Sequence, residues 1–357
     1  MEVIFTFQIG GSERLAANIA KKLSARGFHV SVCATHSGKG PISDDLESAG
    51  IECFAIDAES KNRIRRRYDL FRTFRDNKID VIHVHHVGIF SLVYLPARLA
   101  GVKKIVVTEH NEIDLLNNAR LRRFAKRTLN RIDAVTAIHK QLAEYMQKTL
   151  GVASQKLHVI YNGIDIDRFR PSKTASRQPQ NSDSYRAVFV GRLHPHKNLD
   201  MLINAVARIN KSGKASLSLD IVGTGALKNT LHEKVVRDGL EDCVHFLGQK
   251  TDVPRLLPTY DFLVMSSLTE GVPLVILEAL SSGVPCLATD VGGIAEILPE
   301  NTGIVVQPGN MEALVSGMQK MMDQERLAGF RRHARDHVIR HFSEEKMLDE
   351  YIQVLTS

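Results

Sequence analysis

The feature that most constrains the fold is an alternation of apolar strand patterns with helical patterns, which occurs twice along the 357 residues. Each run opens in the same way, with an apolar strand, a glycine turn and a helix. Strands that alternate with helices are typical of a parallel sheet covered by helices on both faces. A single core also rarely extends through a chain of this length. The sequence therefore predicts an α/β protein built from two doubly wound domains.

A polar stretch with linker composition, residues 171–185, separates the two runs. We predict an N-terminal domain over residues 1–170 and a C-terminal domain over residues 186–340. A last helix over residues 341–357 has apolar side chains to bury, and we expect it to pack back on the first domain. Predicted strands cover residues 3–7, 29–34, 51–56, 81–84, 105–107, 134–138, 159–160, 187–190 and 217–222, and predicted helices begin near residues 12, 64 and 199.

Charge is distributed unevenly along the chain. Residues 1–170 carry 27 Lys and Arg against 18 Asp and Glu, a net +9, whereas residues 171–357 carry 20 against 22, a net −2. A basic half could meet nucleic acid, an anionic membrane face or an acidic substrate. No nucleic-acid-binding motif accompanies the charge, so we expect no nucleic-acid partner. The basic segments 63–67 and 120–131 could dock on an anionic membrane, and solvated helix faces explain them equally well.

Composition also bears on the compartment. No apolar stretch approaches the roughly 20 residues of a membrane-spanning helix, and the apolar N-terminus lacks the basic lead-in of a signal peptide. The cysteines are dispersed without metal-ligand spacing, which favours thiols that act as small hydrophobic groups. We expect a cytoplasmic protein that could attach peripherally to the inner face of the cell membrane. The cysteines are Cys33, Cys53, Cys243 and Cys286.

The strongest chemical signal is the segment E-G-V-P-L-V-I-L-E, from Glu270 to Glu278. Pro273 suits a first helical turn, and the amides around residues 271–274 would then form an anion site. Eight residues of helical rise would separate the two acids by roughly 12 Å, which is wide for a glycosidase pair. Two acids so placed could grip two parts of an extended ligand. An acidic turn followed by a solvated glutamate is the alternative.

Two glycine loops come next in strength. Gly191 follows a strand and precedes Arg192, Lys197 and Asn198, so the backbone could approach a ligand whose phosphates meet two cations. The paired glycines at residues 10–11 open a helix, where they could cradle a phosphate. A solvated basic loop and a tight strand-to-helix turn are the respective structural alternatives.

Several other polar residues follow strands. His110 lies in the segment after the predicted strand 105–107 and could reach a sugar hydroxyl or a phosphate, although a lone histidine is more often structural. His83 and His85 alternate on a strand, so we predict that they face one side, without a metal. Residues 165–167 have the D-x-D spacing of a site for a divalent metal ion, but the sequence shows no further metal ligands to accompany them. The segment 223–228 has Lys228 where a dinucleotide fingerprint requires its third glycine.

Taken in order, these motifs resemble the family-4 retaining glycosyltransferases of the GT-B fold, in which two Rossmann-like domains face each other across a cleft. The resemblance spans essentially the whole chain. The matching segments are Gly10-Gly11-Ser12-Glu13, Thr108-Glu109-His110, Asn162-Gly163-Ile164-Asp165, Gly191-Arg192, Lys197-Asn198, Gly223-Thr224-Gly225, Phe246-Leu247-Gly248, Glu270 to Glu278, and Ala288 to Gly293 with Glu296.

The resemblance implies a retaining transfer of a hexose-type sugar from a UDP- or GDP-sugar to a hydroxyl of a glycan or lipid-linked acceptor, in bacterial surface polysaccharide synthesis. Arg192 and Lys197 would neutralise the departing diphosphate, Glu270 would orient the sugar, and His110 would contact it near its 6-position. Neither a metal ion nor a cofactor is expected. The implied donor-binding residues are Gly10, Gly11, Gly191, Asn198, Gly223, Thr224, Gly225, Leu247, Gly271, Val272, Pro273, Leu274 and, at the ribose, Glu278.

Two departures from the family pattern and two other functions remain. The first strand is short, and His139 stands where relatives often have serine. A nucleotide-sugar 2-epimerase of the same fold would convert the donor without an acceptor. A non-catalytic nucleotide-sugar-binding partner would neither transfer the sugar nor convert the donor. Slow hydrolysis of the donor would favour a transferase over both.

Overall fold

The computed structural model divides into two compact units, each with its own parallel sheet. One unit comprises Met1–Asn162 with Met347–Ser357, and the other comprises Gly163–Lys346. The structure describes residues 1–36, 38–56, 62–111, 113–172, 184–213 and 215–357. Of the predicted linker, residues 173–183 lie outside this description, and residues 184–185 belong to a strand.

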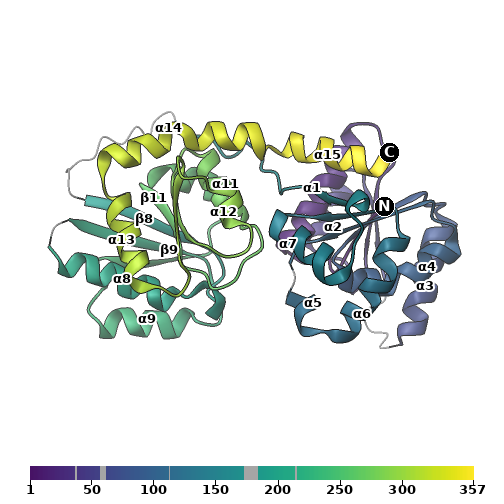
Figure 1. Cartoon of the computed structure of the whole chain (residues 1–357), viewed down its shortest axis with the longest axis horizontal. Coiled ribbons are helices and arrows are strands. Elements are labelled where there is room, and N and C mark those ends of the chain that lie inside the picture. The colour runs from purple at the N-terminus through teal and green to yellow at the C-terminus, as the bar shows by residue number, and fades with distance from the viewer. Residues whose placement is uncertain (37, 57–61, 112, 173–183, 214) are drawn as a thin grey trace. The chain divides into compact units, whose positions relative to one another are not determined.

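The sheet of the first unit has seven parallel strands in the order β3-β2-β1-β4-β5-β6-β7 (Figure 1). The order reverses at β1, as in a doubly wound sheet, so the loops after β1 and β4 leave the same edge of the sheet side by side. The strands are β1 (Glu2–Ile4), β2 (Ser31–Ala34), β3 (Glu52–Ala55), β4 (Val81–His85), β5 (Lys104–Glu109), β6 (Ala134–Ala137) and β7 (Leu157–Val159).

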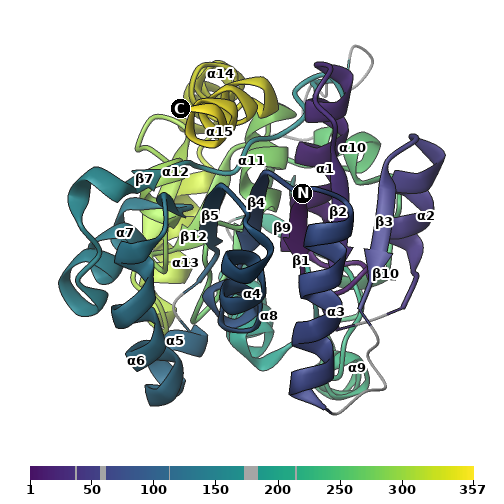
Figure 2. The same cartoon turned by 90° about the vertical axis from the view of Figure 1, so that its right-hand side faces the viewer.

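Helices cover this sheet, and their apolar side chains supply its core. The helix α1 contributes Leu15 and Ile19, which pack with Leu348 and Tyr351 of α15 in one buried cluster, and the two helices lie close together in Figure 1. The helices α3 and α4 pack side by side, as Figure 2 shows. The helices are α1 (Gly11–Ala25), α2 (Pro41–Ser48), α3 (Arg63–Asp76), α4 (Val87–Ala100), α5 (Ile113–Asn117), α6 (Ala119–Thr128), α7 (Lys140–Tyr145) and α15 (Glu344–Thr356).

The second unit repeats the plan with a six-stranded parallel sheet in the order β10-β9-β8-β11-β12-β13. Its order reverses at β8, so the loops after β8 and β11 are neighbours at the carboxyl edge. The strands are β8 (Ser184–Val190), β9 (Ser216–Val222), β10 (Val244–Gly248), β11 (Phe262–Met265), β12 (Cys286–Thr289) and β13 (Gly303–Val306). The helices are α8 (Leu199–Lys211), α9 (Lys228–Arg237), α10 (Val253–Leu256), α11 (Leu274–Ser281), α12 (Ile294–Ile297), α13 (Met311–Met321) and α14 (Gln324–His341).

Some predicted boundaries are wrong. The first strand ends at Ile4 instead of residue 7, because only Glu2–Ile4 pair with β2 and the next residue, Phe5, turns a 47% exposed side chain outward. The second strand starts at Ser31, two residues late. The helix predicted from residue 341 is interrupted, because α14 ends at His341 and α15 begins at Glu344. Of the cysteines, two are fully buried and two are half-buried.

Candidate active site

The loop after β8 is held against the loop after β9 by backbone contacts. The amide of Gly191 donates to the Val222 carbonyl at 2.9 Å, and the amide of Leu193 donates to the Thr224 carbonyl at 2.9 Å. Gly223 has φ +140°, and a Cβ atom there would lie 1.9 Å from the Gly191 carbonyl oxygen. Glycine is therefore required at residue 223 for the two loops to approach so closely.

The loop after β10 joins the same group. The amide of Gly223 donates to the Gly248 carbonyl at 2.8 Å, next to Leu247. A Cβ atom at Gly225 would lie 2.4 Å from the Leu193 carbonyl oxygen. The glycine segment predicted at residues 223–225 thus serves loop packing, and α9 begins only at Lys228.

Lys197 and Glu270, which the sequence places 73 residues apart, form an ion pair in the second unit. Ser267 Oγ donates to the same Glu270 Oε1 at 2.6 Å, and Ser266 Oγ donates to the Lys197 carbonyl at 2.8 Å. The lysine side chain is 20% exposed and the glutamate side chain 12% exposed. The pair is thus largely desolvated but accessible, and each member can exchange its partner for a ligand group.

The segment after Glu270 reaches a helix later than predicted. The helix α11 starts at Leu274 with Pro273 as its N-cap, so Glu270 lies four residues before the first helical residue. Helical rise, from which the separation of roughly 12 Å is predicted, therefore applies only to the second half of that segment. Gly292, at φ +58°, packs its backbone on the Glu270 carbonyl, where a Cβ atom would lie 2.2 Å away. Glu278 lies within the first turns of α11.

Arg192 and Asn198 flank the ion-paired lysine on the same loop. The Arg192 side chain is exposed, and it makes no ion pair within the described part of the chain. Asn198 adopts a left-handed conformation, φ 51°, at the N-cap of α8. The loop therefore offers one exposed guanidinium and one half-buried ammonium to a ligand.

In the first unit, α1 begins at Gly11 with Gly10 as N-cap, in agreement with the predicted glycine turn. Neither glycine has a positive φ. A Cβ atom at Gly11 would meet nothing within 4 Å, and one at Gly10 would meet only the movable carboxylate of Glu13. The fold by itself therefore does not require this pair of glycines.

His110 follows β5 and lies buried in a row of histidines. Its Nε2 lies 3.0 Å from His85 Nδ1, and His85 Nε2 lies 2.8 Å from Glu2 Oε2. The ring of His86 lies 4.7 Å from that of His110 between centroids. Burial, followed by the charges of His86, His85 and His83, lowers the pKa of His110 well below its ordinary value. His110 is therefore a neutral imidazole at neutral pH.

Glu109 makes several hydrogen bonds to the segments around it. Its carboxylate accepts a hydrogen bond of 2.9 Å from the Val87 amide and thereby caps α4. The same carboxylate lies 3.0 Å from His86 Nδ1. Burial disfavours the charged form of His86, but the bond to Glu109 outweighs it and the pKa of His86 is raised. His86 itself has φ 78°, which strains a residue with a side chain.

Sequence reasoning missed Glu2 and His85 as parts of the histidine row. His83 and His85 do face one side, as predicted, since Nδ1 of the first and Nε2 of the second lie 2.9 and 2.8 Å from the same Glu2 oxygen. A charged residue inside an apolar first strand, together with the V-H-V-H alternation, could have indicated this contact. Among the described residues this trio is the one group with the composition of a metal site.

Two other features are structural. The carboxylate of Asp165 accepts from the amides of Asp167 and Arg168, both at 3.0 Å, so this D-x-D segment forms a turn. His139 is fully buried and caps α7, where its Nδ1 accepts from the Leu142 amide at 3.2 Å. The imidazole thus serves as a helix cap, a role that serine hydroxyls often have.

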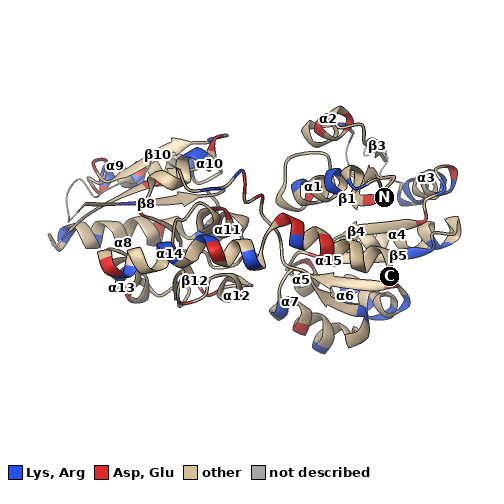
Figure 3. Cartoon of the chain, turned by 90° about the horizontal axis from the view of Figure 1, so that it is seen from above, with Lys and Arg blue, Asp and Glu red and all other residues tan. Residues whose placement is uncertain are grey.

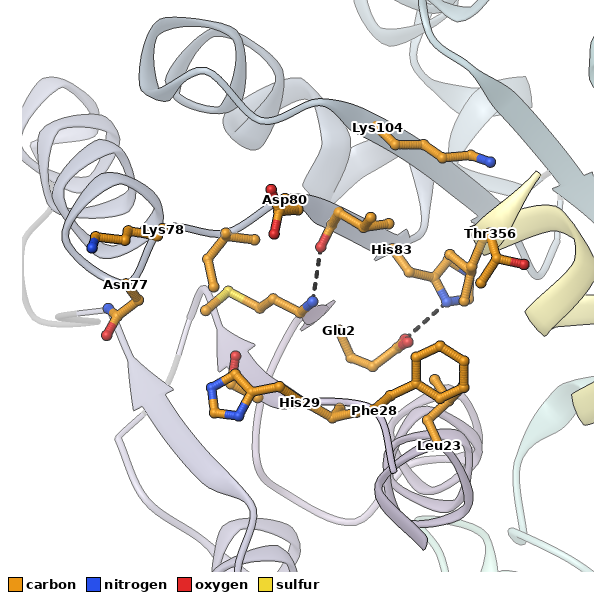
Figure 4. A pocket seen from close by; sticks show the side chains of 16 residues that line it. Glu2, Leu23, Phe28, His29, Asn77, Lys78, Asp80, His83, Lys104 and Thr356 are labelled. Atoms are coloured by element: carbon orange, nitrogen blue, oxygen red, sulfur yellow. Dashed lines mark hydrogen bonds and ion pairs between the residues drawn. The ribbon is translucent and has the colours of Figure 1, made fainter. Parts of the chain in front are cut away.

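A cavity of about 570 Å³ opens at the amino ends of β1, β2, β4 and β5, beside Leu23 and Phe28 (Figure 4). Glu2 and His83 line its wall, and a contact joins them in the figure. Ligands of doubly wound sheets bind at the carboxyl ends of the strands. This cavity is therefore distinct from the loops that carry Gly10 and His110.

The two doubly wound units, each with its polar residues in the loops after the strands, define a two-domain Rossmann-like protein. The family model for glycosyltransferase family 4 matches residues 9–168, and the model described as glycosyl transferases group 1 matches residues 184–324. With one match on each unit, the chain belongs to the family-4 glycosyltransferases.

Relatives and solved structures agree with this membership. The chain is 26% identical to the Escherichia coli UDP-Gal:α-D-GlcNAc-diphosphoundecaprenol α-1,3-galactosyltransferase, over 96% of this chain and 92% of that one. It is 29% identical to the Bacillus anthracis N-acetyl-α-D-glucosaminyl L-malate synthase, over 78% and 74%. The crystal structure of Anabaena HepE in complex with UDP superposes with a TM-score of 0.85 at 22% identity, over 99% and 98% of the two chains. The predicted GT-B fold is confirmed, and the chain is a glycosyltransferase.

Proposed function

We propose that the chain is a retaining glycosyltransferase that moves a hexose-type sugar from a nucleotide-sugar to a hydroxyl of a glycan or lipid-linked acceptor in bacterial polysaccharide synthesis. The observation that carries this proposal is the largely desolvated Lys197–Glu270 pair beside the start of α11. A cation, an acid and a helix start together suit a ligand that has both phosphates and hydroxyls.

The relatives favour UDP as the carrier and a lipid-linked acceptor. The Escherichia coli relative is a galactosyltransferase with a UDP-Gal donor and a GlcNAc-diphosphoundecaprenol acceptor. A Campylobacter jejuni relative, 23% identical over 96% of this chain, also acts on a sugar linked to PP-undecaprenol. The HepE structures hold UDP or UDP-glucose.

In this proposal Arg192 and Lys197 bind the diphosphate, and the amides at the start of α11 add the positive end of a helix dipole. Glu270 orients the sugar and Glu278 accepts from the ribose hydroxyls. The departing phosphate oxygen takes the proton of the acceptor hydroxyl while the new bond forms on the same face of the sugar. Catalysis is then stabilisation of the leaving group together with positioning.

Two cations at the diphosphate do the work that a divalent metal ion does in other transferases, so we propose that transfer needs no metal. Turnover should be the same with a chelator as with added magnesium. A loss of more than roughly tenfold in the chelator would contradict the assignment of Arg192 and Lys197 as the only charges required.

The test of the proposed function is a transfer assay with a panel of UDP- and GDP-sugars and undecaprenyl-diphosphate-linked acceptors. Nuclear magnetic resonance of the product should show the anomeric configuration of the donor retained. Slow release of free sugar in the absence of acceptor is expected as well. Conversion of the donor to its 2-epimer without acceptor, or binding without any turnover, would refute the proposal.

We also propose peripheral docking on an anionic membrane through α6. Among the described residues no helix is long and apolar enough to cross a membrane. Figure 3 shows Lys and Arg along α3 and α6. In α3, Arg63 and Arg67 donate to Ser91, which gives them a structural role. In α6 the exposed basic side chains are Arg120, Arg123, Lys126 and Arg127.

Flotation with vesicles that contain phosphatidylglycerol tests the docking. The protein should float at low salt and dissociate as salt screens the basic side chains. Replacement of Arg123 and Lys126 by Ala should reduce flotation, whereas replacement of the exposed Arg26, which pairs with Asp349, should not. Flotation that is unaffected by the α6 changes would contradict this surface.

A further inference from the structure

A buried row of hydrogen bonds runs from β1 to His110 in the first unit. Glu2 Oε2 contacts His85 Nε2 at 2.8 Å, and His85 Nδ1 contacts His110 Nε2 at 3.0 Å. The side chains of Glu2 and His85 are 3% and 1% exposed, so water has little access to the row. Which ring nitrogens carry a hydrogen must then be determined by the hydrogen bonds within the row.

The first contact fixes the direction of the row. Burial alone would raise the pKa of Glu2, but the neighbouring His83 and His85 outweigh burial and lower this pKa, so Glu2 is a carboxylate that can only accept. His85 Nε2 must therefore carry a hydrogen. Burial, followed by the charge of His83, lowers the pKa of His85 to about 4, so its ring is neutral and has one N–H. Nδ1 of His85 is then an acceptor.

The contact between His85 and His110 then determines the tautomer of His110. Because His85 Nδ1 accepts, His110 Nε2 must donate, and the neutral ring of His110 has no second hydrogen. Its Nδ1 therefore carries a lone pair and no hydrogen. This Nδ1 is not one of the buried side-chain atoms that lack a hydrogen-bond partner, and within the described part of the chain no partner contacts it, so it is accessible. The one atom of His110 left for a ligand is an acceptor.

We infer that Glu2 and His85 are positioning residues that lock His110 as its Nε2–H tautomer, so that His110 takes a hydroxyl and not a phosphate. A hydroxyl can donate to Nδ1, whereas the oxygens of a diphosphate are acceptors and would face another lone pair. This specificity rests on the proposed function, because the hydroxyl would belong to the sugar. The tautomer itself does not depend on it.

Metal binding by Glu2, His83 and His85 is the competing explanation of the same cluster. The two nitrogens lie 2.9 and 2.8 Å from Glu2 Oε2. Ligand atoms around a tetrahedral zinc ion, at 2.0–2.1 Å from it, are separated by about 3.3 Å. Both distances are shorter than this separation, and the one from His85 is that of a hydrogen bond. A metal ion bound to His85 Nε2 would also place the ring hydrogen on His85 Nδ1, which would then donate to His110 and reverse the direction of the hydrogen bonds.

Long-range ¹H–¹⁵N spectra of the histidine rings in the chelator-treated full chain test the inference directly. A His110→Asn variant identifies the signals. The expected result is a protonated Nε2 and an unprotonated Nδ1 for His110, the same for His85, and no change between pH 6 and pH 8. A His110 that is protonated on Nδ1, or a His85 Nε2 that binds added zinc at one equivalent, would overturn the inference.

Two variants separate the row from general stability. In Glu2→Gln the side-chain amide can donate or accept, so both orders of the row become available and His110 should show mixed tautomers. In Thr136→Val, which removes the partner of Thr108 in the same core but leaves the row intact, His110 should keep the wild-type tautomer. A single unchanged tautomer in Glu2→Gln would contradict the role of Glu2.

Kinetics then connect the tautomer to the sugar. Glu2→Gln should lower kcat/KM about 3- to 10-fold for a donor with its 6-hydroxyl, the loss of one hydrogen bond, and leave it unchanged for the 6-deoxy donor. An equal loss with both donors would mean that the tautomer does not select the hydroxyl. If the tautomer is as inferred but no sugar is transferred at all, the proposed function fails and the inference about Glu2 and His85 stands.

Discussion

At the scale of single residues, the second unit depends on a lysine that has two possible partners. Lys197 pairs with Glu270, while Ser267 donates to the same carboxylate oxygen. In the proposed reaction the diphosphate competes for this ammonium group. The glutamate thus keeps the lysine in place before a ligand arrives and is then available for the sugar hydroxyls.

Lys197→Ala removes the half-buried cation. We expect kcat to fall roughly 10²-fold or more, as for the loss of one preorganised charge at a developing anion. Steady-state transfer kinetics measure this. Lys211→Ala, at the exposed end of α8, is the matched control and should keep wild-type kinetics. Near-normal turnover in the Lys197 variant would remove this residue from the mechanism.

Glu270→Gln separates binding from transfer. Without the carboxylate, Lys197 no longer has a competing anion, and UDP should bind about 3- to 10-fold tighter, which corresponds to roughly 1 kcal/mol. Transfer should nevertheless slow by about 10²-fold, because the sugar loses its orienting acid. Calorimetric titration with UDP and transfer kinetics measure the two effects. Weaker UDP binding would show that the carboxylate supports the phosphate site.

The sequence predicts the identities of these residues but not their partners. Lys197, Glu270 and His110 stand in motifs, and motifs are local. The pairing of Lys197 with Glu270 joins the ends of β8 and β11, and the row from Glu2 to His110 joins three strands. Such contacts depend on strand order and register, which periodicity does not determine.

At the scale of the elements, the order of strands and helices could be predicted, because the hydrophobic periodicities of strand and helix are both strong. The residues at which the elements begin and end could not be predicted. β1 ends early because its ladder with β2 ends, and α11 starts late because Pro273 serves as its cap. Both outcomes depend on neighbouring strands or on cap geometry. The loops after β8, β9 and β10 show the same dependence, since their glycines are needed for backbone approach.

Gly223→Ala should disrupt these loops. The added methyl group would overlap the Gly191 carbonyl and require an unfavourable φ, so the free energy of unfolding should fall by about 3 kcal/mol or more. Urea denaturation measures the change. Gly239 also has a positive φ, but in the left-handed helical region at +64°, and a Cβ atom there would meet nothing within 4 Å, so Gly239→Ala should cost only about 1 kcal/mol. Equal losses in the two variants would mean that backbone approach is unimportant.

The second sheet also carries a buried acid whose pKa links stability to pH. Asp220 on β9 accepts from Arg186 at 3.0 Å, Tyr260 at 2.7 Å and His245 at 2.9 Å. Burial favours the protonated acid, but the hydrogen bonds from Tyr260, His245 and Arg186 outweigh it and lower the pKa of Asp220. The ionised acid therefore stabilises the fold above its unfolded pKa of about 3.9.

Asp220→Asn should lower the free energy of unfolding by about 1–3 kcal/mol at pH 7, because three donors lose a charged acceptor. A depressed folded pKa means that this stabilisation is lost as pH falls through it. The gap between wild type and variant should therefore narrow below about pH 4. Urea denaturation from pH 3 to pH 7 measures this, and a gap that is constant with pH would contradict the assignment.

At the scale of the whole molecule, the two units divide the proposed work. The second unit holds the cations, the acids and the helix start that suit a nucleotide-sugar, and the first holds the His110 row and most of the positive charge. The family expectation places the acceptor in the first unit. A two-unit architecture lets the donor pocket stay similar while acceptor loops vary, which fits the different acceptors named among the relatives.

The central claim is that Arg192, Lys197 and the start of α11 bind a diphosphate, and calorimetric titration with UDP and with uridine tests it most directly. Wild-type protein should bind UDP at least about 100-fold tighter than uridine, because charge-assisted hydrogen bonds contribute roughly 1.5–3 kcal/mol each. In the double variant Arg192→Ala, Lys197→Ala this ratio should fall to about tenfold or less, while the affinity for uridine stays the same. An undiminished preference for UDP in the double variant would contradict the claim.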